Sequence, residues 1–176
     1  MLDEYGFEIF EQNAFPIAYL LTFRTYGTWL HGDPRGAFQR RRTEPMPAIP
    51  VAPNIPLREK MLEITDPTAV ILNDRQRELV NDSIEEVCSF RSYDLRALNV
   101  RTNHVHAVIS KAVKPEKILN DLKAYATRRL RMERAVASDQ KVWARHGSTR
   151  YLWKPKQVQS AIEYVLYGQG DLPFET

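Results

Sequence analysis

Apolar residues recur along the chain at two spacings, one typical of strands and one typical of helices. Residues 17–25 are rich in β-branched and aromatic side chains and precede Tyr26-Gly27, which predicts a first strand followed by a turn. Asn73 can cap a helix that extends to about Tyr93, because the apolar residues after it share one helical face: Leu79, Val80, Ile84, Val87 and Phe90. A helix with such a stripe is expected to pack on a sheet.

The second half of the chain continues the same alternation. Residues 95–102 and 104–110 read as strands joined by a tight turn at Thr102-Asn103, so they should pair antiparallel. Pro115 begins a helix that continues to about Arg134, with an apolar stripe that consists of Ile118, Leu122, Tyr125, Ala126 and Leu130. Residues 151–153 then predict a short strand, and 156–167 a last helix closed by glycines.

The order of these elements is β, α, β, β, α, β, α, with a long insert after the first strand. It predicts an α+β fold of the ferredoxin-like type, in which helices pack on one antiparallel sheet. A chain of 176 residues suits a single domain over 1–176. The insert, at about 31–67, holds seven prolines and the run Arg40-Arg41-Arg42, and it is expected to be irregular, with a short helix possible at 57–62.

Composition indicates a globular protein, with 43% hydrophobic and 27% charged residues. The chain has no apolar run of about 18 residues, as a membrane span needs, and its first residues are acidic where a signal peptide is basic. We therefore expect a cytoplasmic protein without a membrane partner. The single cysteine, Cys88, lies in the first predicted helix and is expected to be buried.

Positive charge is concentrated in one segment. Residues 121–159 contain ten Lys or Arg against three Asp or Glu, while the rest of the chain is slightly acidic. Such a segment is typical either of a solvated helix face or of a surface that binds a polyanion such as DNA. The candidate DNA-binding residues are Lys123, Arg128, Arg129, Arg131 and Arg134 on the second helix, followed by Arg150, Lys154 and Lys156.

His104 and His106 form the strongest candidate site. One residue separates them, so on a strand both imidazoles point to the same face and can meet one divalent ion. This pattern alone does not distinguish a metal site from surface or partly buried histidines. A nucleotide hydrolase of the histidine-triad type would need a third histidine, but position 108 is valine, and a structural zinc site would need two further ligands near the pair.

The run from Asn103 to Ile109, Asn-His-Val-His-Ala-Val-Ile, resembles the His-hydrophobe-His strand of the HUH nucleases. Three later features, in the same order, resemble the REP-associated tyrosine transposases, which are insertion-sequence single-tyrosine transposases of the HUH group. They are the basic helix, the segment 151–155, and Ala-Ile-x-Tyr-Val at 161–165. The first strand is similar as well, so the resemblance covers residues 17–170, with the insert matched least.

The resemblance implies a function and assigns roles. His104 and His106 would hold Mg²⁺ or Mn²⁺, and Tyr164 would attack the scissile phosphate to leave a 5′-phosphotyrosine. Tyr167 and Tyr125 are the rival tyrosines. Members of the group place Asn or Gln four residues after the tyrosine as a third metal ligand; this chain has Gly168 there, which makes Gln169 the nearest substitute.

The same resemblance implies a nucleoid-associated homodimer that acts on single-stranded or hairpin DNA. Exposed aromatic side chains would stack on unpaired bases, and the candidates are Tyr26, Trp29, Trp143 and Trp153. For Trp153 a place in the core is equally expected from its strand. One alternative stays open because of Gly168: a nucleic-acid-binding or regulatory protein that keeps the fold but has lost cleavage.

Overall fold

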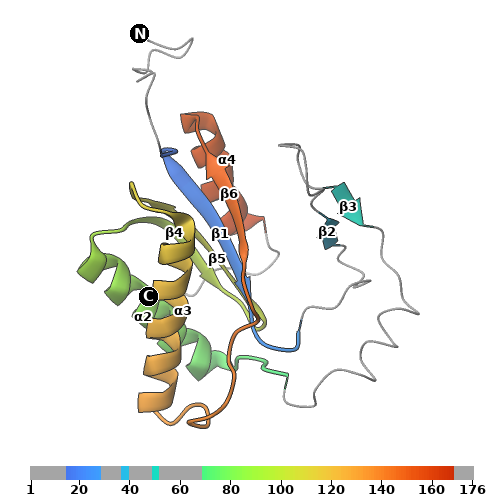
Figure 1. Cartoon of the computed structure of the whole chain (residues 1–176), viewed down its shortest axis with the longest axis vertical. Helices are drawn as coiled ribbons and strands as arrows, with labels where there is room; N and C mark the ends of the chain where they lie inside the picture. The colour runs from blue at the N-terminus through green and yellow to red at the C-terminus, as the bar shows by residue number, and fades with distance from the viewer. Residues whose placement is uncertain (1–14, 29–36, 40–48, 52–68, 169–176) are drawn as a thin grey trace.

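A four-stranded antiparallel sheet lies at the centre of the computed structural model of the chain, which describes residues 15–28, 37–39, 49–51 and 69–168 (Figure 1). Its strands lie side by side in the order β4 (Asp94–Val100), β5 (His104–Ser110), β1 (Ala18–Arg24) and β6 (Ser148–Leu152). β5 and β1 are therefore neighbours at the centre of the sheet, although they are far apart in the sequence. This order, with helices between the strands, confirms the α+β ferredoxin-like prediction.

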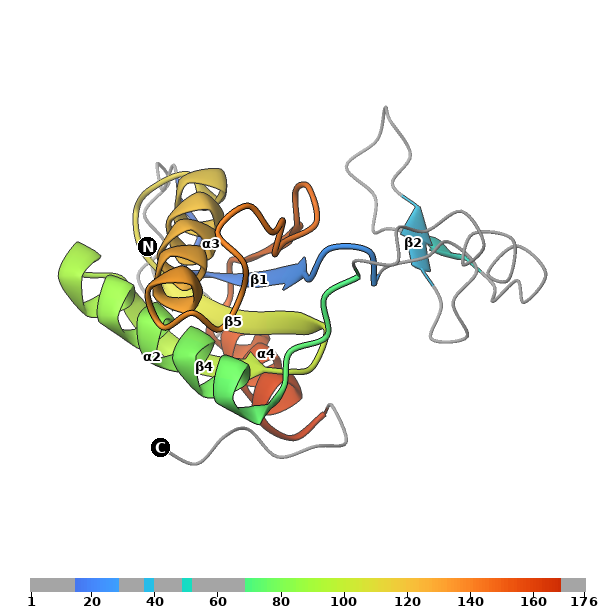
Figure 2. The ribbon, with the colours of Figure 1, turned by 90° about the horizontal axis from the view of Figure 1, so that it is seen from below.

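Helices cover both faces of the sheet. α2 (Asp74–Arg91) and α3 (Pro115–Met132) pack together on one face, whereas α4 (Pro155–Tyr167) lies on the other, as Figure 2 shows. The sequence predicted all three helices, but it did not predict that the last one covers the opposite face. None of the helices among the described residues is long and apolar enough to cross a membrane.

The two layers between sheet and helices differ in size. The layer under α2 and α3 is large and contains most of the buried bulky side chains, such as Tyr19, Phe23 and Ile109. The layer under α4 is smaller and consists of apolar residues, most of them alanine or valine: Ala18, Ala97, Val108, Leu152, Val158, Ala161 and Val165. Most of the apolar burial that stabilises the fold is therefore on the α2 and α3 side.

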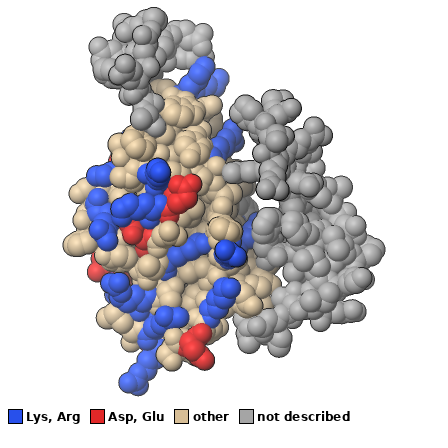
Figure 3. All heavy atoms as spheres, viewed as in Figure 1, with Lys and Arg blue, Asp and Glu red and all other residues tan. Residues whose placement is uncertain are grey.

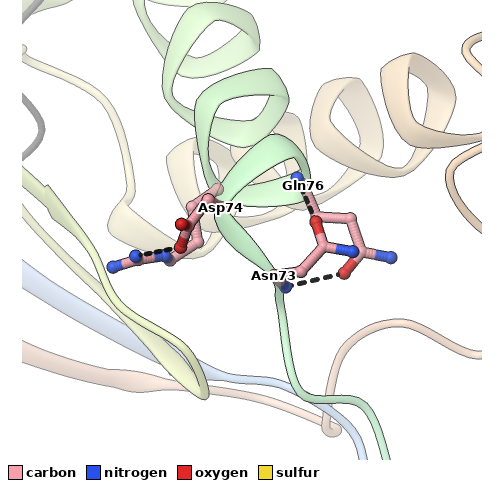
Figure 4. Close-up of polar contacts among 4 residues, drawn as sticks. Asn73, Asp74 and Gln76 are labelled. Carbon is pink, nitrogen blue, oxygen red and sulfur yellow. Dashed lines mark hydrogen bonds and ion pairs between the residues drawn. The ribbon is translucent and has the colours of Figure 1, made fainter.

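The start of α2 follows from its sequence. Asn73 caps the helix: its Oδ1 accepts a hydrogen bond from the Gln76 backbone N–H at 2.9 Å, and the Gln76 side chain accepts one from the Asn73 N–H at 2.9 Å (Figure 4). The Asp74 carboxylate pairs with Arg77 at 2.6 Å in the first turn, where the helix dipole favours negative charge. A cap of this kind stabilises a helix by about 1 kcal/mol.

Two expectations about side chains were wrong. Phe90, expected in the buried stripe of α2, is 70% exposed. Cys88, in the same helix, is buried as predicted, and this burial raises the pKa of its thiol to about 12. Trp143 is buried and packs edge-on against Phe23, with 5.0 Å between the ring centroids, because its loop pairs with Thr25 at the end of β1 and folds back onto the core.

Part of the insert is also ordered into strands. β2 (Ala37–Gln39) pairs antiparallel with β3 (Ile49–Val51), which the sequence did not predict. The proposed short helix at 57–62, the Arg40-Arg41-Arg42 run and Trp29 lie outside the described residues.

Candidate active site

His104 and His106 lie on β5, on the sheet face that α4 covers. Their ring centroids are 4.7 Å apart and the rings are nearly perpendicular, at 80°. The two side chains are 9% and 6% exposed. The strand alternation thus brings both imidazoles to one face as predicted, and it places them in a mostly buried position rather than on an open surface.

Neighbouring polar groups orient both rings. His106 Nδ1 is hydrogen-bonded to Oγ1 of Thr22, its partner across the β1–β5 pairing, at 2.7 Å. His104 Nδ1 lies 2.6 Å from Oδ1 of Asn103. Since an amide oxygen only accepts, Nδ1 of His104 carries the proton. Outer hydrogen bonds of this kind are typical of metal-binding histidines, and they make Nε2 the nitrogen that would bind an ion.

Tyr164, on α4, contacts the histidine pair across the layer between α4 and the sheet. Its ring lies edge-on against that of His106, with 5.6 Å between centroids and 73° between planes. The helix sets this orientation, because Ala161 and Val165 are buried against the sheet while Tyr164, between them, stays 45% exposed. The fold thus brings together the three residues predicted as the centre of the site.

The rival tyrosines lie elsewhere. Tyr167 is the last residue of α4 and is 71% exposed. Tyr125 belongs to α3, on the opposite face of the sheet, where the Arg128 guanidinium lies over its ring at 5.0 Å. Of the three tyrosines, Tyr164 is therefore the one whose ring contacts His106.

Gly168 ends α4 in close contact with Tyr164. Its N–H donates to the Tyr164 carbonyl oxygen at 3.0 Å. A Cβ at this position would lie 2.9 Å from that oxygen and 3.0 Å from Cδ2 of the Tyr164 ring. Real Cβ atoms avoid such distances, so a side chain at 168 would displace the tyrosine. This crowding gives a physical reason for glycine where the resembling transposases carry Asn or Gln.

Few side chains near the histidine pair could act as further metal ligands among the described residues. Within the described ranges, no group of three or more His, Cys, Asp or Glu side chains lies close enough together to hold a metal ion. Gln169, the predicted third ligand, lies outside those ranges. The two imidazoles thus form the donor set that the described structure provides.

A groove of about 530 Å³ runs between β6 and α4 and reaches Tyr164. Its lining includes three cations, Arg150, Lys154 and Lys156, together with Ser160. These three were predicted as DNA-binding residues from their charge alone. The structure adds that they border the same cavity as the candidate nucleophile.

Tyr151 and Trp153 lie at the same edge of the sheet. Their rings are stacked, with 6.3 Å between centroids and 14° between planes, and the side chains are 45% and 51% exposed. Tyr151 also packs edge-on against Tyr19, which belongs to the layer under α2 and α3. Trp153, for which the sequence left core and surface equally open, is a surface residue.

The cations of α3 form a second, separate basic surface. They lie on the side of the sheet opposite α4, and Figure 3 shows Lys and Arg gathered on this face. Arg128 and Arg131 border a shallow hollow of about 600 Å³. Arg129 is ion-paired with Glu86 of α2, and Arg134 lies beyond the helix end with a left-handed φ of 53°.

Lys123 differs from the other cations of α3. Its ammonium group donates to the carbonyl oxygens of Ala144, at 3.0 Å, and of His146. Burial lowers its pKa. These contacts tie α3 to the loop before β6, which makes Lys123 a weaker candidate for a phosphate contact than its exposed neighbours.

Comparison with known proteins places this chain in a family. Residues 64–163 match the family model of IS200-like transposases, which covers more than half of the chain. The chain belongs to this family. The matched region includes both histidines and ends at Glu163, directly before Tyr164.

A solved structure of a REP-associated tyrosine transposase bound to a REP hairpin has a similar fold. The TM-score is 0.51 at 11% sequence identity, over 92% of this chain and 72% of that one. At this identity the likeness supports the architecture alone. No curated protein matches the sequence.

The contact between Gly168 and Tyr164 leads to a first prediction. Gly168→Ala should displace the Tyr164 ring, because the added Cβ has no room beside Cδ2 and the carbonyl oxygen. The nuclear Overhauser effects between the Tyr164 and His106 rings should weaken or vanish. Ser160→Ala, on an exposed position of the same helix, should leave them in place. Unchanged ring contacts in Gly168→Ala would show that the last turn accommodates a side chain.

Proposed function

We propose that this IS200-like transposase is a metal-dependent single-strand DNA endonuclease and strand transferase of the REP-associated type. The observation that carries the proposal is the contact between the rings of Tyr164, on a helix, and His106, on a strand, two residues 58 positions apart in the sequence. A phenol beside two buried imidazoles combines a nucleophile with a metal-binding pair. The pair, the tyrosine and a basic groove are all present within one chain.

In the proposed reaction Tyr164 Oη attacks the scissile phosphorus. A bond forms between Oη and phosphorus, and the bond to the 3′ oxygen breaks, so the leaving strand ends in a 3′-hydroxyl once that oxygen is protonated. The other strand remains as a 5′-phosphotyrosine. Because this diester keeps the energy of the broken bond, attack by another DNA 3′-hydroxyl reverses the step and joins strands without ATP.

His104 and His106 would hold the metal, Mg²⁺ or Mn²⁺, through Nε2. Their fit rests on the hydrogen bonds from Nδ1 to Asn103 and Thr22, which fix how each ring faces the site. A bound divalent ion would withdraw charge from the phosphate. Gln169 stays the proposed third ligand on the basis of the sequence resemblance.

The groove beside Tyr164 is the proposed path of the single strand. Arg150, Lys154 and Lys156 would contact its phosphates, and unpaired bases would stack on Tyr151 and Trp153 at the adjacent sheet edge. The exposed cations of α3 would contact another part of the substrate, such as a hairpin stem. A homodimer and a place at the nucleoid in the cytoplasm remain proposals from the resemblance.

A second candidate function is a DNA-binding protein that has lost cleavage. Gly168 favours it, because the position of the usual third ligand has no side chain and no room for one. The adduct experiment below separates the two functions.

The nucleophile is tested by trapping the covalent intermediate. Incubation with Mn²⁺ and a 5′-flanked hairpin oligonucleotide should attach the protein to the 5′ end of the cleaved strand. Tyr164→Phe should abolish this adduct, since only the reactive oxygen is lost, whereas Tyr125→Phe and Tyr167→Phe should retain it. Peptide mapping identifies the attached residue. An adduct at Tyr167 would refute the assignment, and DNA binding without any cleavage would favour the second function.

The metal site is tested by replacing either histidine. His104→Ala and His106→Ala should each lower metal-dependent cleavage at least about 100-fold, because the ion loses one of its two histidine ligands. Their affinity for the oligonucleotide should stay within a few-fold of wild type, since Lys and Arg supply most of the binding. Filter binding and cleavage assays at the same salt separate the two effects. Full cleavage by His106→Ala would rule out the site.

The strand path is tested by comparing the two basic surfaces. Lys154→Gln with Lys156→Gln should weaken single-strand binding and reduce its salt dependence by up to about two counterions. Arg128→Gln with Arg131→Gln, a matched change on α3, should affect single-strand binding less. Wild type should prefer single-stranded or hairpin DNA over plain duplex. Equal losses from both double variants would show that the groove has no special role.

A further inference from the structure

Asn99 lies between the histidine pair and the helix that carries Tyr164. It is on β4, directly across from His106 in the β4–β5 pairing, and its side chain points to the α4 face. The residue is 2% exposed. Its Nδ2 donates a hydrogen bond to the backbone carbonyl oxygen of Val165 at 2.9 Å. One buried amide thus links the strand beside the histidines to the residue that follows Tyr164.

A polar side chain at this position needs a reason. The apolar cluster under α4 includes Ala97, Val108 and Ala161, and leucine has the same branched shape as asparagine, with the same number of side-chain heavy atoms. Burying an amide is unfavourable unless it is hydrogen-bonded, and the net gain from one such bond is only about 1 kcal/mol. Packing alone would therefore be served as well by leucine. What asparagine adds is a bond with a defined direction.

The acceptor of that bond is informative too. Val165 is in the last turn of α4, where the helix itself supplies no N–H group for the carbonyl oxygens. The Asn99 amide therefore acts as a cap that comes from the sheet rather than from the helix. It fixes this last turn, and with it the neighbouring Tyr164, relative to β4 and β5.

The apolar contacts of α4 cannot do this equally well. Alanine and valine side chains give contacts that are not directional, so a short helix on such a layer can rotate or slide at small cost. The active site, in contrast, requires the phenol to keep its place beside His106. A displacement of about 1 Å at a reacting group can lower a rate about 100-fold.

We propose that Asn99 is a positioning residue that holds Tyr164 against the histidine pair. The inference rests on the proposed function of Tyr164, but the position of the ring can be measured without catalysis. Asn99 touches neither DNA nor metal in this account. Its loss should therefore change the rate of the chemical step and not the affinity for either ligand.

The main variant is Asn99→Leu, which keeps the branched shape and removes the donor. At saturating oligonucleotide we expect kcat for cleavage to fall about 10- to 100-fold, with Kd for the oligonucleotide and for Mn²⁺ within two-fold of wild type. The remaining product should shift from the Tyr164 adduct toward a Tyr167 adduct or free 5′-phosphate. The nuclear Overhauser effects between the Tyr164 and His106 rings should weaken in the free protein.

Asn81→Leu is the matched control. Asn81 is also buried, at 6% exposure, but its Nδ2 bonds to Glu85 within α2, on the far side of the sheet. We expect this variant to change stability without changing kcat, the adduct position or the ring contacts. If Asn99→Leu does not fold, Asn99→Ala removes the same donor without adding an apolar branch, and the same readouts apply.

Two results would overturn the inference. One is a folded Asn99 variant with wild-type ring contacts and wild-type kcat. The other is a parallel loss of kcat and of Mn²⁺ or DNA affinity, which would mean general damage to the site. Failure of the proposed function looks different: wild type itself would then give no Tyr164 adduct, while the ring contacts would still report whether Asn99 fixes the helix.

Discussion

The burial of β5 on both faces is the constraint on which the rest of the structure depends. The strand lies between β1 and β4, and six of its seven residues are buried. Because side chains alternate, Val105, Ala107 and Ile109 enter the large layer under α2 and α3, while His104, His106 and Val108 face α4. A shift of register by one residue would put the imidazoles into the large apolar layer. The packing that stabilises the fold therefore also fixes which way the histidines point.

The two faces of the sheet consequently have separate roles. The side under α2 and α3 contains the bulky core and supplies most of the burial. The side under α4 has a smaller layer, mostly of alanine and valine, and across it the rings of Tyr164 and His106 lie edge-on. Basic residues occur on both sides, and among the described residues Arg150, Lys154 and Lys156 are the cations that border the cavity at Tyr164. A count of charges along the sequence cannot separate these two surfaces, because both lie within residues 121–159.

The limits of sequence-based prediction follow the same division. Local patterns determined the elements: the bounds of β5, the Asn73 cap and the helix after Lys114 were all predicted, as was the shared face of the two histidines. The features that the sequence did not predict are those set by contacts between distant segments. Trp143 looks like a loop residue, but its segment pairs with Thr25 and enters the core; Lys123 looks like a surface cation, but it binds carbonyl oxygens of the same loop. The face covered by α4, and the groove beside β6, depend on how the helix turns after Trp153, which spacing along one element cannot reveal.

The end of α4 combines a glycine at the position where the resemblance expects a third ligand with a hydrogen bond that comes from the sheet. In the resembling transposases a side chain four residues after the tyrosine would link the last turn to the metal. Here Gly168 has no side chain, and the space is occupied by the Tyr164 ring and its carbonyl oxygen. The last turn must then be fixed from the other direction, by the sheet, and the hydrogen bond from Asn99 to the Val165 carbonyl provides such a link independently of any metal. The proposed nucleophile thus follows a helix turn that is linked to the sheet by a contact within the protein itself.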